Sequence, residues 1–238
     1  MLFFLIRHGD PIYEPDSLTP LGHRQAEAVA KRLARYGLDK IYTSTSNRAM
    51  QTAVPTCELL HTGAETLDWC NEDRYSWEYF TIIDKKGERH WVFQDDDTVQ
   101  MMVSPEVRAL GERWFDHPYF GQTRCKEGVA FIQKQADDFL ASLGFVHDRE
   151  KGVYHRQAPK HERVALFAHQ GFSLAFLSAV LDIPYPMLCT HFDTSHSCVT
   201  MLEFEDKAVT VPRVLTLSND AHIYREGLPT RYNDMFYY

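Results

Sequence analysis

Apolar residues alternate along this chain between short unbroken runs and helical repeats. The unbroken apolar run Leu2–Ile6 predicts a strand buried on both faces of a parallel sheet. Thr19 and Pro20 predict the start of a helix, because threonine favours the N-cap and proline the first helical position. Gly37 predicts the end of that helix.

The same alternation returns further along the chain. Lys40–Thr43 predicts a second strand, and Asn47–Leu60 predicts a second helix with an interruption at Pro55. Arg163–Ala168 predicts a buried strand, followed by a helix that runs to about Leu181. Strands that alternate with helices indicate an α/β fold, with a mostly parallel central sheet flanked by helices on both faces.

The stretch from about residue 68 to 128 breaks this alternation. Its tryptophans include Trp69, Trp77 and Trp91, and a helix start is predicted at Ser104. We interpret it as a small insertion that covers the C-terminal ends of the strands. Two late strands are predicted near 198–204 and 213–217, and we expect residues 1–238 to form a single domain with this one insertion.

Composition and charge narrow the possible partners. Of the 238 residues, 33 are acidic and 25 basic, which gives a formal charge of -8. This balance argues against a non-specific nucleic-acid binder and against docking on an anionic membrane. The aromatic content of 13% argues against disorder. The pattern carries no signal for oligomeric state.

Cysteine usage and the N-terminal residues bear on location. The apolar run before Arg7 is too short for a signal peptide or a membrane span. Five cysteines form no Cys-x-x-Cys pair, so neither a zinc cage nor a disulfide framework is indicated. We therefore expect a cytoplasmic protein with free thiols and no metal.

Chemistry-bearing residues follow three of the predicted strands. The first strand runs into Arg7-His8-Gly9, which offers a guanidinium fork, an imidazole and a backbone that permits close approach. The second is followed by Ser44–Ala49, where hydroxyls and N–H groups at a helix start, with Arg48 beside them, predict an anion site. The third is followed by His169. We expect all three groups at one edge of the sheet.

The order and spacing of these segments resemble the histidine phosphatase (phosphoglycerate mutase-like) superfamily. The segments that carry the resemblance are Leu5-Ile-Arg-His-Gly9, Leu18-Thr-Pro-Leu-Gly22, Arg48-Ala-Met-Gln-Thr-Ala53 and Ala168-His-Gln-Gly171. The resemblance implies that His8 is a nucleophile that becomes phosphohistidine. It also implies that Arg7, Arg48 and a catalytic His169 complete the phosphate pocket, with no cofactor. In this reading two guanidiniums and an imidazolium neutralise the phosphate oxygens without metal.

The family's proton donor is usually a glutamate in the insertion. Glu72 in Trp69-Cys-Asn-Glu72 is the candidate here, and Asp73 and Glu78 are its rivals. A solvated acidic residue in a loop is the structural alternative for Glu72.

The resemblance implies a phosphomonoesterase of the phosphatase branch that acts on a small phosphorylated metabolite. Glu14 stands where mutases of the family carry a Glu-Ser-x-Trp-Asn stretch, and few basic residues follow Glu72, so hydrolysis is favoured over mutase transfer. A phosphoglycerate mutase-type phosphotransferase and a catalytically weak phospho-ligand binder remain the alternatives.

Other histidines are interpreted as structural or solvated. His147-Asp148 is the dipeptide of metal-dependent phosphohydrolases, but it lies in a polar segment that predicts a solvated loop. His191, His196 and His222 follow no zinc spacing. His196 and His222 flank the late strands; structural roles are favoured for both, and a place in the lining of the site is the alternative.

Overall fold

The computed structural model describes residues 1–159 and 161–233, which divide into two compact units. The first unit comprises residues 1–71, 158–170 and the chain from Asp193, and the second comprises 72–157 and 171–192. The insertion expected at 68–128 falls largely in the second unit, and the single-domain organisation stays a prediction.

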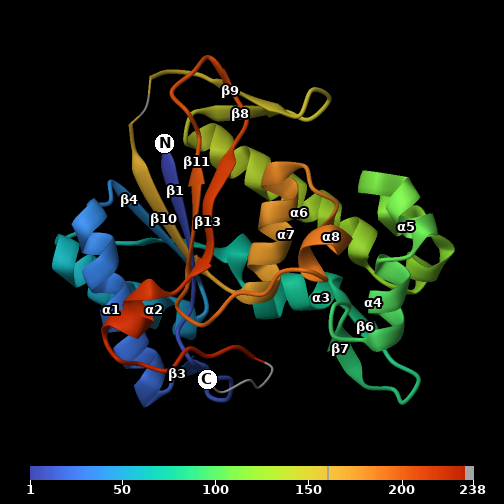
Figure 1. The fold of residues 1–238 in the computed structure, drawn as a ribbon, viewed down its shortest axis with the longest axis horizontal. Coiled ribbons are helices and arrows are strands. Elements are labelled where there is room, and N and C mark those ends of the chain that lie inside the picture. Colours follow the sequence, from blue (N-terminus) through green and yellow to red (C-terminus); the bar gives the residue numbers. More distant parts are fainter. Residues whose placement is uncertain (160, 234–238) are drawn as a thin grey trace. The chain divides into compact units, whose positions relative to one another are not determined.

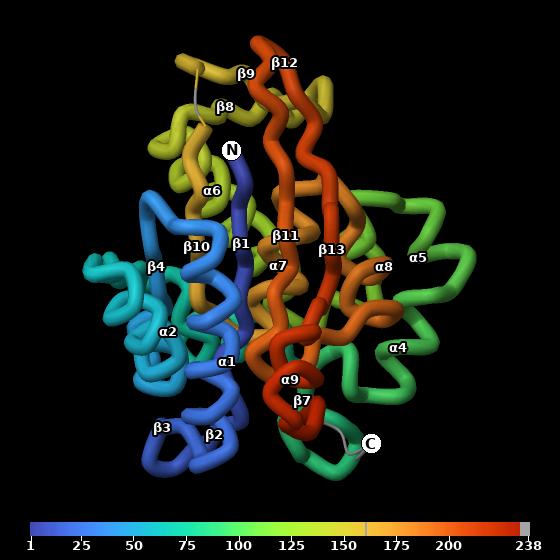
Figure 2. Tube along the Cα trace, turned by 60° about the vertical axis from the view of Figure 1, so that its left-hand side comes forward, coloured from blue at the N-terminus to red at the C-terminus, as the bar shows by residue number. Residues whose placement is uncertain are grey.

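A six-stranded sheet forms the centre of the first unit (Figure 1). Its strand order is β13-β11-β1-β10-β4-β5, and β1 pairs in parallel with β10, β10 with β4, and β4 with β5. Strand β11 is antiparallel to both of its neighbours. Figure 2 shows β10, β1, β11 and β13 side by side. The bounds of the sheet strands are β1 Leu2–Arg7, β4 Lys40–Ser44, β5 Glu65–Leu67, β10 Arg163–Ala168, β11 Val199–Glu203 and β13 Arg213–Asn219.

Helices α1 (Pro20–Tyr36), α2 (Asn47–Leu60) and α9 (Ala221–Arg225) complete the first unit, with the short strands β2 (Pro11–Ile12), β3 (Ser17–Leu18) and β12 (Val209–Thr210). Apolar side chains from the sheet, α1 and α2 form its core, among them Phe4, Val29, Leu33, Ala53 and Phe167. The predicted mixed α/β fold with a mostly parallel central sheet is confirmed.

Helices α1 and α2 begin and end close to where the sequence predicts. Thr19 caps α1 by accepting a hydrogen bond from the Gly22 amide, and Gly37 ends it with a φ of 68°. The predicted interruption at Pro55 is wrong, because α2 continues through this residue to Leu60. Packing of α2 against α1 and β4 offsets the cost of a proline inside the helix.

Two glycines bring the loop after β1 against α1. A Cβ atom at Gly9 would lie 2.6 Å from the carbonyl oxygen of Gly22, and a Cβ at Gly22 would overlap the carbonyl oxygen of Asp10. Only residues without a side chain permit this backbone approach. The loop after β1 is therefore fixed by its contact with α1.

The second unit is mainly helical. Its helices are α3 Trp77–Tyr79, α4 Asp96–Met102, α5 Pro105–Leu110, α6 Cys125–Ser142, α7 Gln170–Leu181 (whose first residue belongs to the first unit) and α8 Tyr185–Cys189; its strands are β6 Thr81–Ile83, β7 Arg89–Trp91, β8 Phe145–Asp148 and β9 Val153–Arg156. Ser104 caps α5 as the sequence predicts. Within the described residues, no helix is both long and apolar enough to cross a membrane.

His147 in the second unit contradicts its predicted place in a solvated loop. It lies on β8 with its side chain fully buried, and its two ring nitrogens lie 3.0 Å from Asp137 and 2.9 Å from Asp182. Arg149 pairs with both carboxylates, and the His147 ring stacks on Tyr154 at 4.0 Å. The carboxylates and the aromatic ring stabilise a buried histidine that the sequence pattern alone places in solvent.

Candidate active site

His8 lies directly after β1 and is almost fully buried in the first unit. Its Nδ1 atom contacts the Gly9 carbonyl oxygen at 2.8 Å. That carbonyl fixes the tautomer with the proton on Nδ1 and leaves the Nε2 lone pair for attack. The Gly9 amide donates to Thr52 Oγ1 at 3.0 Å, so α2 also holds this loop.

The first unit brings His169 and Arg7 to the same place. The ring centroid of His169 lies 5.2 Å from that of His8, and its Nε2 atom lies 2.9 Å from Ser44 Oγ and 3.4 Å from Ser46 Oγ. Buried Arg7, the last residue of β1, donates to the Thr194 carbonyl oxygen. Parallel β1, β10 and β4 therefore place three polar groups at one sheet edge.

Burial and positive neighbours keep both pocket histidines neutral. Burial lowers the pKa of His8 well below its usual value, and His169, Arg7 and Arg48 lower it further. Burial, Arg48 and Arg7 likewise lower the pKa of His169. The protein groups around His169 therefore do not favour the imidazolium that the sequence predicts at this position. A neutral His8 has the lone pair that a nucleophile needs.

Arg48 is buried in the first turn of α2, but the helix N-terminus is not an open anion site. Asp16 accepts from the Asn47 amide at 2.6 Å and from Arg48 Nη1 at 2.9 Å. The Asp16 carboxylate therefore lies at the start of α2, where the sequence predicts a substrate anion. No local motif marks Asp16, because it lies in a turn 31 residues before Asn47.

His196, for which the sequence favours a structural role, also lies beside His8. Its ring stacks against His8 with centroids 5.8 Å apart, and its Nδ1 atom lies 3.3 Å from an Asp10 carboxylate oxygen. Burial and Arg7 lower its pKa to about 4, although Asp10 opposes this shift. Asn233 contacts both His196 Nε2, at 3.1 Å, and Arg7. The pocket thus contains a third neutral histidine.

The candidate proton donor Glu72 is buried in the second unit and accepts a hydrogen bond from the Phe172 amide at 3.2 Å. Its rival Glu78 is half-exposed, and hydrogen bonds from Arg89 and Arg124 lower its pKa. Asp73 is exposed. Among the three carboxylates, Glu72 alone is shielded from water.

Three ligand-type side chains gather elsewhere in the second unit, on the β6–β7 hairpin. Donor atoms of Asp84, Glu88 and His90 lie within 4.8 Å of one another, but Glu88 is exposed and Asp84 accepts from the Glu88 amide to shape the turn. Exposed acidic turns of this kind are common without an ion, and we assign no metal here.

Residues 3–117 match the family model of the histidine phosphatase superfamily (branch 1). This match confirms the resemblance predicted from the sequence. No curated protein sequence matches the chain.

Solved structures show the same fold. A phosphoserine phosphatase from Entamoeba histolytica, in complex with 3-phosphoglyceric acid, is 16% identical with a TM-score of 0.61, and the match covers 93% of this chain and 98% of that one. A mycobacterial glucosyl-3-phosphoglycerate phosphatase with inorganic phosphate is 20% identical with a TM-score of 0.59, at the same coverages of 93% and 98%.

Proposed function

We propose that this chain is a histidine phosphatase: a metal-independent phosphomonoesterase that acts on a small phosphorylated metabolite through a phosphohistidine at His8. The observation that carries the proposal is the state of His8. It is buried and neutral, Gly9 holds Nδ1, and Arg7 and Arg48 are buried nearby.

The first half-reaction forms a bond between His8 Nε2 and phosphorus while the bond from phosphorus to the ester oxygen breaks. Arg7, Arg48 and His169 neutralise the three equatorial oxygens, the task that magnesium has in kinases. A phosphate dianion beside His169 raises the pKa of that imidazole, so substrate binding itself favours the imidazolium. In the second half-reaction, water attacks the phosphohistidine and inorganic phosphate leaves.

We assign the proton transfers to Glu72. It gives a proton to the leaving alkoxide in the first half-reaction and takes one from the attacking water in the second. Two observations support the assignment: its burial, and the anchoring of the preceding residue, Asn71, whose Nδ2 atom donates to Thr45 Oγ1 at 2.9 Å. Thr45 stands between Ser44 and Ser46, the two serines beside His169.

Hydrolysis of an aryl phosphate with chelator present tests the proposal. We expect turnover that survives chelation and falls roughly 10⁴-fold or more in His8→Ala, because the covalent path is lost. Rates of hydrolysis of phosphoserine and 3-phosphoglycerate then show which class of natural phosphate ester the enzyme prefers. Inorganic phosphate that binds with no turnover of any ester would favour the binder, and phosphoglycerate interconversion with bisphosphoglycerate present would favour the mutase.

Replacing Glu72 by glutamine tests the proposal that Glu72 is the proton donor. We expect kcat to fall about 10²–10⁴-fold while inorganic phosphate binds with unchanged affinity, because only the proton transfer is lost. Asp73→Asn, one residue away and exposed, is the matched control and should change kcat less than twofold. Equal losses in both variants would contradict the assignment.

A further inference from the structure

A second cation-rich cavity lies in the first unit, outside the phosphate pocket. It has a volume of ≈ 610 Å³, within the range of small-molecule sites. Its charged lining consists of Lys31, Arg32 and Arg35 from α1, Arg225 from α9 and Glu226 directly after α9. It shares no lining residue with the cluster of Arg7, His8, Arg48 and His169.

The floor of this cavity is held rigidly. Arg32 Nη1 donates to the Asn219 side chain at 2.7 Å and to its carbonyl oxygen at 3.0 Å. His222 beside it is buried, and burial together with Arg32 lowers its pKa to about 4, so this imidazole is neutral.

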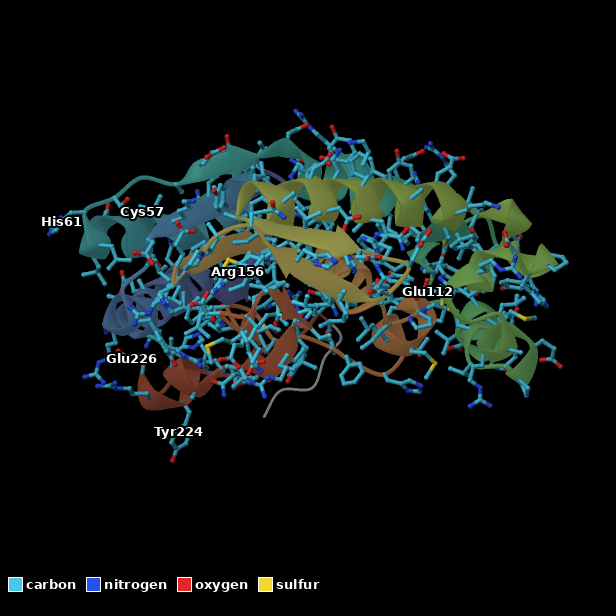
Figure 3. All side chains as sticks on the ribbon, turned by 90° about the horizontal axis from the view of Figure 1, so that it is seen from above. Cys57, His61, Glu112, Arg156, Tyr224 and Glu226 are labelled. Atoms are coloured by element: carbon cyan, nitrogen blue, oxygen red, sulfur yellow. The ribbon has the colours of Figure 1, made fainter. Side chains whose placement is uncertain are left out.

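The rim of the cavity carries positive charge that this chain does not neutralise. Within the described part of the chain, Arg35 and Arg225 make no hydrogen bond or ion pair, and both are exposed. Lys31 pairs with Glu226, the single carboxylate of the lining, at 2.6 Å. Figure 3 labels Glu226, which directly follows α9, and Tyr224 on α9. Four cationic side chains thus face one carboxylate in a protein whose formal charge is -8.

We propose that this cavity binds a compact phosphoryl polyanion of the bisphosphate or polyphosphate class. Guanidinium forks match phosphate oxygens in geometry, and several such groups around one cavity match a ligand with several negative charges. An extended polyanion is disfavoured, because the acidic surface beyond the cavity repels it.

Calorimetric titration of pyrophosphate into the His8→Ala protein, which removes the proposed nucleophile, tests the site. We expect Arg35→Ala combined with Arg225→Ala to weaken one binding event at least tenfold. Arg24→Ala is the matched control, since it removes an exposed arginine from the same side of α1 about 16 Å away, and should change nothing.

A variant with the opposite effect separates binding from misfolding. Glu226→Gln removes the single carboxylate of the lining, and we expect pyrophosphate to bind two- to fivefold tighter. In the protein that retains His8, the double variant Arg35→Ala, Arg225→Ala and the variant Glu226→Gln should both leave basal hydrolysis of an aryl phosphate unchanged. Pyrophosphate isotherms that are the same in all variants would overturn the proposal, and citrate that binds as tightly as pyrophosphate would overturn the phosphoryl assignment.

Discussion

His8 in the first unit and His147 in the second are both buried histidines, but their neighbours carry opposite charges. Cations surround His8 and burial lowers its pKa, whereas Asp137 and Asp182 raise the pKa of His147 against the effect of burial. A histidine between two carboxylates stabilises the fold when protonated. A neutral histidine among arginines gains no such stabilisation, and its surroundings instead suit attack on an anion.

Of the changes that test this difference between the two histidines, removal of a cation beside His8 should have the largest effect. We expect Arg48→Ala to lower kcat/KM about 10²–10³-fold, because one phosphate-binding group is lost. The acidic limb of the pH profile of kcat/KM should also move to higher pH, since Arg48 is one of the groups that lower the pKa of His8. His147→Gln, which alters the other histidine, should leave kcat/KM within twofold. A comparable loss there would break the distinction between the two sites.

Removing the imidazole of His147 should act on stability. We expect His147→Gln to lower the free energy of unfolding by about 2 kcal/mol, because two carboxylates lose a charged partner. Denaturant unfolding measures the difference. His155→Gln on neighbouring β9, where the side chain is 44% exposed, should cost less than about 0.5 kcal/mol.

The contribution of His147 to the free energy of unfolding depends on pH. The folded pKa of His147 is raised above its unfolded value, which is near 6.5. Its contribution is therefore complete below about pH 6.5 and is lost as pH rises through the folded pKa. The difference between wild type and His147→Gln should therefore shrink as pH rises above about 6.5. A difference that grows over this range would contradict the protonated pair.

Asp16 is the carboxylate that contacts Arg48, and its removal should give the smallest effect. We expect Asp16→Ala to cost about 1 kcal/mol of unfolding free energy, because the first amides of α2 lose their acceptor. Exposed Glu14 in the same loop is the control, and Glu14→Ala should stay within about 0.5 kcal/mol. Equal melting curves for wild type and Asp16→Ala would refute the capping role.

The sequence predicts what depends on local pattern. The unbroken apolar run of β1 indicates burial on both faces, and the adjacent residues Thr19 and Pro20 indicate the start of α1. Both features are therefore predictable from the sequence. The partners of His147 and Arg48 lie 10 to 35 residues away along the chain, and no local signal connects them. His196 likewise meets His8 only because β11 pairs antiparallel with β1.

The contact between Gly9 and Gly22 has a consequence for engineering this protein. A library that varies α1 for solubility or stability would treat Gly22 as an ordinary helical glycine to be replaced by alanine. A methyl group there would press on the backbone of the loop that carries His8. Gly22 therefore belongs with the residues to be held constant, although it has no functional group of its own.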